Sequence, residues 1–298
     1  MKKMIIKFFQ KKGIVVYLNQ ILRSLTKSSS EYQLIKLADS ESVKSFFKLI
    51  HPVNAGHELI RIGPNHDGGY LLPNDLVGIN YCFSPGVGGS ILFEENLLDF
   101  GIESFLLDPS VVAPSTNLKG IHFEQKPLTP ATGDLFSFKM FDDLSDDTRN
   151  EKGISLHDWV NSKATSTDAD LILQLDIENS EYQVLLATPI DLLKKFRIMA
   201  IEFHSFHNLR YQYNLDNIFL PLFTKILSEF DIVHIHPNNV AQNIPFSKFK
   251  LPHALEITFH RRDRRISSPT KLVKITNDLD FETVKDVKKV FIDERLFE

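Results

Sequence analysis

Short apolar runs alternate with amphipathic stretches from about residue 57 onward. Seven runs have the length of strands, and most are bounded by Gly, Pro, Asn or Asp. They cover residues 80–84, 104–108, 120–123, 171–176, 197–203, 232–236 and 255–259. Apolar positions at helical spacing predict helices after Ser90, after Ser180 and over 214–230. This alternation predicts an α/β fold with a doubly wound seven-stranded sheet.

The chain divides into three parts by its pattern of apolar and polar residues. Residues 1–50 look helical, 51–265 carry the alternating pattern, and 266–298 form a tail that we expect to pack on the domain. Residues 1–30 hold seven basic side chains and no acidic one, interleaved with apolar positions. Such a segment is either a helix docked on its own domain or a peripheral contact with an anionic membrane surface.

Composition narrows the class of protein. The 298 residues are 43% hydrophobic, which suffices for a packed core, and 34 basic residues face 38 acidic ones. An acidic body argues against nucleic acid as the main partner. No apolar stretch reaches the ~20 residues that span a bilayer. The single cysteine, Cys82, fits a reducing compartment. We therefore expect a cytoplasmic protein, with the inner membrane face as the alternative, and an oligomeric state that the composition leaves open.

Doubly wound sheets bind ligands at the carboxyl ends of their strands. The first strand ends in a glycine turn, Ser84-Pro85-Gly86-Val87-Gly88-Gly89-Ser90, which lets a ligand approach the backbone beside a helix start. A dinucleotide fingerprint would need a third glycine at position 91, which is Ile91. The turn therefore favours a ligand with a single carboxylate, such as S-adenosylmethionine, over a pyrophosphate.

Two residues near this turn are further cofactor candidates. Asp108 ends the second strand twenty residues after Gly88, where a carboxylate can accept hydrogen bonds from ribose hydroxyls. An Asp-Pro turn explains the same residue without a ligand. Tyr70, in the segment Asp67-Gly68-Gly69-Tyr70, could cover a cofactor at the sheet edge or simply follow a turn.

The later strands end in carboxylates and imidazoles. Since residues two apart on a strand share a face, neighbouring strands could bring these groups into one pocket. The predicted set is Asp176, Glu178, Glu202, His204 and His236. It could act as a general base, or hold a divalent cation such as magnesium through Asp176, Glu202 and His204. For any single histidine, a solvated or core role is the alternative. The chain has no HExxH or CxxC motif, so a zinc hydrolase lacks its signature.

A basic run, Arg261-Arg262-Asp263-Arg264-Arg265, follows the last predicted strand. We expect a solvated basic patch there, with capture of an anionic acceptor as the alternative.

Three segments resemble the FkbM-type methyltransferases. They are ISLHDWV at 154–160, LQLDIENSE at 173–181 and IEFH at 201–204, within a similarity that covers about residues 57–262. The resemblance implies a class I methyltransferase (Rossmann-like) fold, S-adenosylmethionine as cofactor, and a hydroxyl, often on a sugar, as acceptor. It implies Gly86 and Gly88 at the methionine end of the cofactor and Asp108 at its ribose. The chain departs from the family at three positions. Ser84 and His157 stand where the family has Asp, and Asn179 stands where the family has Gly.

The leading hypothesis is an S-adenosylmethionine-dependent O-methyltransferase acting on a sugar hydroxyl of a glycan or glycan precursor. A hydroxyl needs a base or a metal to become nucleophilic. His204 or His236 is the candidate base, with Asp176, Glu178 and Glu202 orienting it or holding a cation. The alternatives are a non-catalytic glycan-binding or scaffold module and a metal-dependent hydrolase. An amine or protein acceptor is also open.

Overall fold

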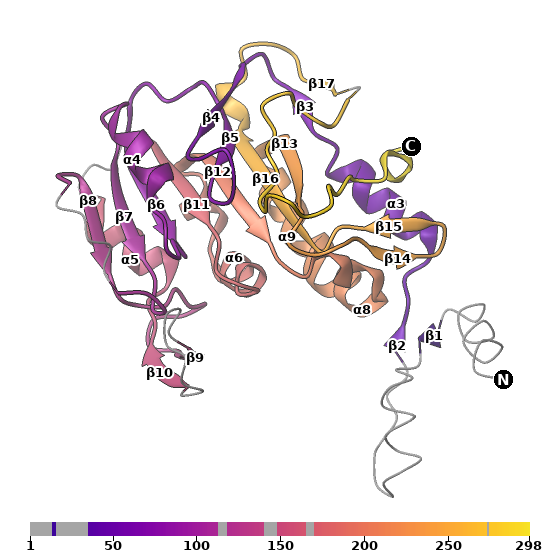
Figure 1. The fold of residues 1–298 in the computed structure, drawn as a ribbon, viewed down its shortest axis with the longest axis horizontal. Coiled ribbons are helices and arrows are strands. Elements are labelled where there is room, and N and C mark those ends of the chain that lie inside the picture. Colours follow the sequence, from indigo (N-terminus) through magenta and orange to yellow (C-terminus); the bar gives the residue numbers. More distant parts are fainter. Residues whose placement is uncertain (1–13, 16–34, 113–117, 140–147, 165–169, 273) are drawn as a thin grey trace, which may run out of the picture.

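All seven predicted strands belong to one central sheet. The computed structural model describes residues 14–15, 35–112, 118–139, 148–164, 170–272 and 274–298 (Figure 1). The strands of the sheet are β6 (Ile79–Pro85), β7 (Glu103–Leu107), β8 (Ile121–Glu124), β11 (Asp170–Leu175), β12 (Phe196–Phe203), β13 (Phe230–Asn238) and β16 (Ala254–Arg261). The observed bounds differ from the predicted ones by at most two residues at either end.

The sheet is mostly parallel, with one antiparallel strand inserted near an edge. Its order is β13-β16-β12-β11-β6-β7-β8, and β16 runs antiparallel to both β12 and β13. The chain moves outward from β6 to β7 and β8, then returns to β11 on the other side of β6. The strand order therefore reverses between β6 and β11, where sheets of this kind bind ligands.

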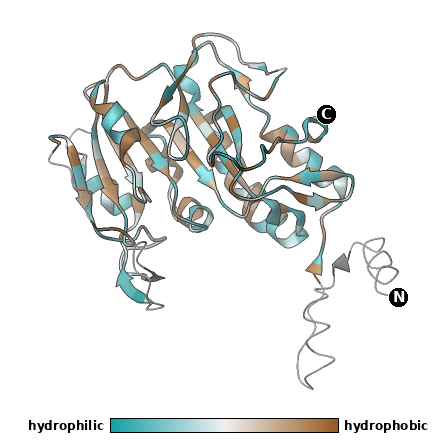
Figure 2. Cartoon of the chain, viewed as in Figure 1, coloured by the Kyte–Doolittle hydropathy of each residue, from teal (hydrophilic) through white to brown (hydrophobic). Residues whose placement is uncertain are grey.

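Helices cover both faces of the sheet. One face carries α4 (Leu92–Leu98) and the hairpin of β4 (Leu59–Ile62) and β5 (Tyr70–Pro73), which bury Phe93, Leu97 and Leu72 against the strands. The other face carries α3 (Ser40–Leu49), α5 (Leu156–Lys163), α6 (Glu181–Ala187), α7 (Ile190–Leu193) and the segment α8 (Gln212–Asn214), η2 (Leu215–Phe219) and α9 (Leu220–Leu227). Figure 2 shows hydrophobic positions concentrated on the strands between these layers.

The predicted helices form, with small differences at their starts. Ser180 occupies the N-cap position of α6, as predicted, but its side chain makes no capping hydrogen bond. Ile91 rather than Ser90 occupies the N-cap of α4. The long helix predicted over 214–230 contains a π-helical turn, η2, between α8 and α9. An extra residue in a helical turn of this kind shifts the face that the helix presents, which simple 3.6-residue spacing does not anticipate.

Helix α3 near the start of the described chain and the turn η4 at its end both join the main core. Phe46 and Phe47 of α3 are fully buried, and so is Leu296 of η4 (Glu294–Leu296). Of the predicted N-terminal extension, 1–13 and 16–34 lie outside the described residues, and so does most of the candidate membrane segment 1–30. No helix in the described part of the chain combines the length and apolar character that crossing a membrane requires.

Short two-stranded sheets complete the architecture. They pair β1 (Ile14–Val15) with β2 (Ile35–Lys36), β3 (Val53–Asn54) with β17 (Thr270–Lys271), β9 (Leu135–Phe138) with β10 (Arg149–Lys152), and β14 (Ile244–Phe246) with β15 (Phe249–Leu251). Two 3-10 turns, η1 (Phe206–Arg210) and η3 (Arg262–Arg264), follow β12 and β16.

The basic run after β16 is not the solvated patch that its charge suggested. Arg262 and Arg265 form ion pairs with Asp231, and Arg264 binds Asp75 through two nitrogens at 2.8 and 2.9 Å. Arg261 pairs with Asp170 at 2.7 Å. These guanidinium groups fasten the end of β16 to the starts of β11 and β13 and to the loop that carries Asp75, which leaves them little capacity to capture an anionic acceptor.

Candidate functional site

The polar residues of the sheet gather on the face that α4 and the β4–β5 hairpin cover. Ser84 and Gln174 hydrogen-bond there at 2.6 Å, two positions after the apolar Cys82 and Ile172. Further along, Glu202 of β12 lies directly opposite Glu256 of β16. The carboxyl-end half of this face is therefore polar, whereas Cys82, Ile172 and Ile198 in its other half belong to the core.

The two glycines assigned to the cofactor have different roles in the turn after β6. A Cβ on Gly86 would lie 1.5 Å from the carbonyl oxygen of Asp176, so glycine is required there for the close approach of two loops. Gly88 has a φ of 53° and open space where its Cβ would be. Gly88 therefore borders a cavity, while Gly86 holds the β6 turn against the end of β11.

Asp108 lies beside this turn and is almost fully buried. One carboxylate oxygen accepts a hydrogen bond from the Gly88 amide at 3.0 Å, and the other accepts from the amide and hydroxyl of Ser110 at 2.8 and 2.7 Å. The oxygen that binds Gly88 has room for a second donor. Asp108 thus fixes the glycine turn and keeps acceptor capacity for a ligand hydroxyl.

A cavity of about 240 Å³ opens between the glycine turn and the β4–β5 hairpin. Its wall includes Tyr70, whose hydroxyl accepts from the Gln174 amide at 3.3 Å. Five carboxylate residues line it, and its described lining includes no Lys, Arg or His. The acidic residues are Asp67, Glu94, Asp108, Asp176 and Glu178. A cavity with this lining favours a cationic occupant and repels a phosphate.

A second hollow, of about 370 Å³, adjoins the first on the side of β7. The two share five lining residues, among them Asp108 and Asp176. The second is walled mainly by apolar side chains: Leu107, Pro109, Pro127, Leu128, Phe136, Phe138 and Ile177. Asp108 therefore lies between an acidic compartment and an apolar one.

Glu94 of α4 is a functional candidate that sequence reasoning missed. Its side chain is buried at the wall of the acidic cavity, where one carboxylate oxygen accepts from the Ser84 hydroxyl. The other oxygen has no hydrogen-bond partner among the described residues. Burial raises the pKa of Glu94 to about 7 in spite of the Ser84 hydrogen bond. A glutamate beside Phe93 and Leu97 on an apolar helix face was the signal available in the sequence.

The structure brings four of the five predicted pocket residues together around His204. The Nε2 atom of His204 lies 3.7 Å from Asp176, 3.4 Å from Glu178 and 3.7 Å from Glu202. A fourth carboxylate, Glu181, accepts a hydrogen bond from His204 Nδ1 at 2.8 Å. Glu181 is fully buried in the first turn of α6 and was not among the predicted site residues.

This cluster holds more negative charge than its protein partners compensate. Burial and the charge of Glu202 raise the pKa of Asp176 well above its usual range, and burial and Glu256 raise that of Glu202 to about 8. Burial alone would lower the pKa of His204, but the Glu181 hydrogen bond and the surrounding carboxylates raise it to about 10. The cluster therefore favours an additional positive charge, either a proton or a bound cation.

The loops that carry the cluster hold strained backbone. Glu178 and Asn179 have φ values of 52° and 78°, and Ser205, next to His204, has a φ of 50°. Only two other described non-glycine residues have positive φ. Asparagine adopts this conformation more readily than most residues, so Asn179 is suited to this position.

His236 has a different environment from the one predicted. It lies 3.6 Å from Asp280 of the C-terminal tail, next to His234, which contacts the same carboxylate at 2.8 Å. The neighbour of Glu202 on β13 is Asn238, which donates to it at 2.7 Å. Among the described residues, no hydrogen bond or ion pair joins His236 to His204 or to the carboxylates around it, so the expected convergence of all five residues is not found. A cavity of about 520 Å³ lies between His236 and the tail.

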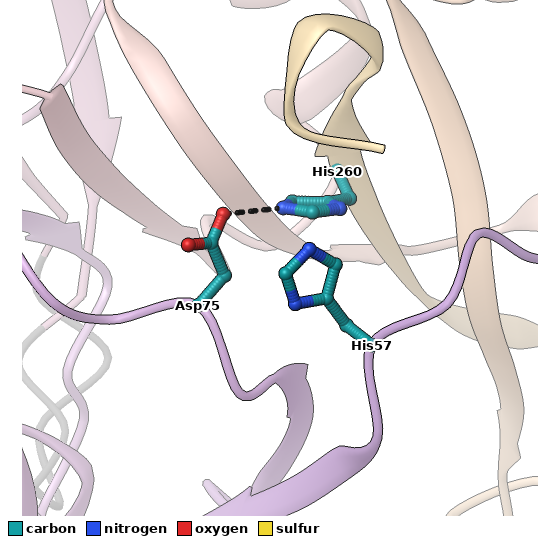
Figure 3. A group of neighbouring side chains, drawn as sticks. All are labelled: His57, Asp75 and His260. Carbon is teal, nitrogen blue, oxygen red and sulfur yellow. Dashed lines mark hydrogen bonds and ion pairs between the residues drawn. The ribbon is translucent and has the colours of Figure 1, made fainter. Parts of the chain in front are cut away.

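A second histidine–carboxylate group lies at the other end of the same sheet face (Figure 3). His260 of β16 contacts Asp75 at 3.0 Å, and His57 approaches the His260 ring edge-on with 4.9 Å between ring centroids. Both oxygens of Asp75 also bind Arg264, and Arg197 lies 3.3 Å away. These cations use up the acceptor capacity of Asp75, so this group is a structural ion-pair network.

Comparison with known proteins does not identify the chain. No family model matches its sequence, and no protein of curated function is significantly similar to it.

Proposed function

We propose that this chain is an S-adenosylmethionine-dependent O-methyltransferase of the class I (Rossmann-like) fold, acting on a sugar hydroxyl of a glycan or glycan precursor. The observation that carries the proposal is the charge of the cavity at the strand-order reversal. Five acidic residues and no basic one line it in the described chain. S-adenosylmethionine carries a sulfonium, an ammonium and a single carboxylate, whereas dinucleotides carry a pyrophosphate that this lining repels.

The acidic cavity and the apolar hollow match the methionine part and the purine part of S-adenosylmethionine, respectively. Glu94 offers an unpaired, buried oxygen to the ammonium of the methionine part, in the acidic cavity. Asp108 would accept from the ribose hydroxyls at the junction of the compartments. The apolar hollow, with Phe136 and Leu128, suits a purine ring. The open space at Gly88 leaves room for the chain of the ligand to pass.

The acceptor would meet the cofactor beside the His204 cluster. When bound, S-adenosylmethionine supplies an activated methyl group for in-line displacement. Asp176 lines both compartments and lies beside His204, so it is placed to orient a hydroxyl and to take part in removing its proton. The strained residues Glu178 and Ser205 flank this position, which is consistent with a functional site.

Equilibrium titration with S-adenosylhomocysteine tests the cofactor assignment. We expect micromolar binding to the purified protein, weakened at least about tenfold in Asp108→Asn and in Glu94→Gln because each removes a charged hydrogen-bond partner. Glu95→Gln changes the next residue on α4 and should bind normally. Binding of NAD in competition with S-adenosylhomocysteine would contradict the charge argument.

The same titration separates the alternative functions. A binding module that retained the fold without the activity predicts no saturable binding of S-adenosylhomocysteine. A metal-dependent hydrolase predicts activity that chelators abolish and that S-adenosylmethionine does not affect. Transfer of a labelled methyl group to a panel of sugars and sugar nucleotides, compared with amines, then identifies the acceptor.

A further inference from the structure

We propose that Asp176, Glu181 and His204 form a divalent-cation site beside the cofactor cavity. The ligand atoms of these three residues all lie within 4.8 Å of one another. The residues come from the end of β11, the first turn of α6 and the end of β12, three elements that meet at one edge of the sheet. The site deepens the proposed function, but the binding of a metal does not depend on methyl transfer.

Two buried carboxylate oxygens point to a missing partner. Oδ1 of Asp176 and Oε2 of Glu181 are inaccessible to solvent and have no hydrogen-bond partner among the described residues. Glu181 is fully buried, and its other oxygen already accepts from His204 and from the backbone amides of Ile177 and Asn179. Leaving such oxygens unpaired is costly. A cation would satisfy both at once.

The spacing around His204 supports the same conclusion. Its Nε2 atom lies 3.7 Å from Oδ1 of Asp176, which is too long for a hydrogen bond. Two ligands of one metal ion at bond lengths of ~2.1 Å and a tetrahedral angle are separated by about 3.4 Å. The observed separation therefore needs only a small adjustment to place both atoms on one ion.

The ligand set differs from the one that the sequence suggested. Glu202 was predicted as a ligand, but it hydrogen-bonds Asn238 at 2.7 Å and is not one of the residues whose ligand atoms converge. Glu181 takes its place. Glu178, whose side chain is mostly exposed, and Glu202 remain within 3.7 Å of His204 and add negative charge around the ion.

The chemistry of the ligands indicates which ions fit. Carboxylates bind Mg²⁺, Ca²⁺ and Mn²⁺, whereas an imidazole ligand suits transition-metal ions such as Zn²⁺, so a site with both kinds of ligand fits an ion between these two classes. We therefore infer a site for an ion of the Mn²⁺ or Zn²⁺ type. Placed next to the acceptor, such an ion would lower the pKa of a coordinated hydroxyl.

Titration of the purified full-length protein with MnCl₂, followed by electron paramagnetic resonance of free Mn²⁺, tests the site without any substrate. We expect one ion bound per chain, and affinity at least about tenfold weaker in Asp176→Asn and Glu181→Gln. The matched control is His57→Gln, in the group of His57, Asp75 and His260 (Figure 3). The carboxylate of that group is already paired with Arg197 and Arg264. This variant should bind Mn²⁺ as the wild type does.

Three results would overturn the inference: no binding of Mn²⁺ or Zn²⁺ at millimolar concentration, binding unchanged in Asp176→Asn, or binding lost only in His57→Gln. Glu181 also holds the loop after β11, so the binding result for Glu181→Gln is interpreted only if this variant unfolds cooperatively on heating. If it does not, His204→Gln is used in its place. Titration with S-adenosylhomocysteine in the absence of metal is scored separately. A protein that binds the nucleoside but no metal retains the proposed function and loses this site.

Discussion

The two histidine–carboxylate groups on the sheet face show how differently similar residues can be used. In both, the potential ligand atoms lie within 4.8 Å of one another. Asp75 lies beside the imidazoles of His57 and His260 (Figure 3). It also pairs with the guanidinium groups of Arg197 and Arg264. His204 is one imidazole among four carboxylates. Proximity alone therefore does not define a metal site, and the balance of charge distinguishes the structural group from the functional candidate.

The largest effect on stability is expected at Asp75. Together, Arg264, His260 and Arg197 outweigh its burial and lower its pKa to about 2, so the carboxylate is ionised and fully paired. Asp75→Asn would leave the guanidinium group of Arg264 without its ion-pair partner and would remove one of the two carboxylates that face the buried Arg197, which keeps Asp170 at 2.7 Å. We expect a loss of about 3–5 kcal/mol in the free energy of unfolding, measured by urea denaturation.

Asp263→Asn is the control for this substitution. Asp263 pairs with Arg261 at the surface, with a side chain 61% exposed, so its loss should cost at most about 1 kcal/mol. Equal costs at the two positions would contradict the description of Asp75 as the centre of a buried network.

Asp176→Asn, in contrast to Asp75→Asn, should leave the stability intact and reduce the rate of methyl transfer. The change removes one negative charge from a cluster whose carboxylates already repel one another, so the free energy of unfolding should stay the same or rise. Methyl transfer should fall about a hundredfold or more, because Asp176 is placed beside the acceptor position. Denaturation and single-turnover transfer with labelled S-adenosylmethionine measure the two quantities. Stability lost together with activity would make this group structural as well.

A pH titration can sharpen the role of Glu94. Its pKa in the folded protein is about 7, against an ordinary 4.5. The neutral form is therefore favoured on folding, and this contribution to stability is lost as the pH rises from about 4.5 through 7. Glu95 and the Cys82 thiol are the neighbouring titratable groups.

The affinity for the cofactor should increase as the pH rises, whereas the contribution of Glu94 to stability decreases. An ionised Glu94 pairs with the ligand ammonium, so affinity for S-adenosylhomocysteine should rise up to about tenfold between pH 6 and 8. Calorimetric titration across this range checks the expectation, with Glu94→Gln as the comparison. A slope that persists in Glu94→Gln would assign the titration to another group.

The sequence predicted the sheet well because strand ends and alternation are local signals. Every one of the seven runs became a strand of the central sheet, and Asp176, Glu202 and His204 meet because they lie at the carboxyl ends of adjacent parallel strands. The antiparallel insertion of β16 was not predictable in the same way. Its pairing between β12 and β13 depends on contacts distant in sequence.

Other site residues depended on tertiary partners that no spacing reveals. His236 lies where alternation places it, but Asp280, forty-four residues later, contacts it from the tail. Glu94 and Glu181 lie on the buried sides of short helices, where a carboxylate is unexpected and its partner comes from another strand or loop. The arginine run was misread for the same reason, because its counterions, Asp75 and Asp231, lie far away in sequence.

The smallest predicted effect concerns Asn179, in the loop beside His204. Its positive φ is readily available to glycine, and its backbone amide donates to Glu181 at 3.1 Å, a bond that glycine retains. Asn179→Gly should therefore change the free energy of unfolding by less than about 1 kcal/mol and keep Mn²⁺ binding, whereas Asn179→Ala should cost about 1 kcal/mol. Ser247, with a φ of 52° on the β14–β15 hairpin, gives a matched position far from the cluster in sequence. Ser247→Gly should affect neither metal nor nucleoside binding. If Asn179→Gly abolished Mn²⁺ binding while Ser247→Gly did not, the asparagine side chain itself would be part of the site, and the cluster would need a ligand beyond Asp176, Glu181 and His204.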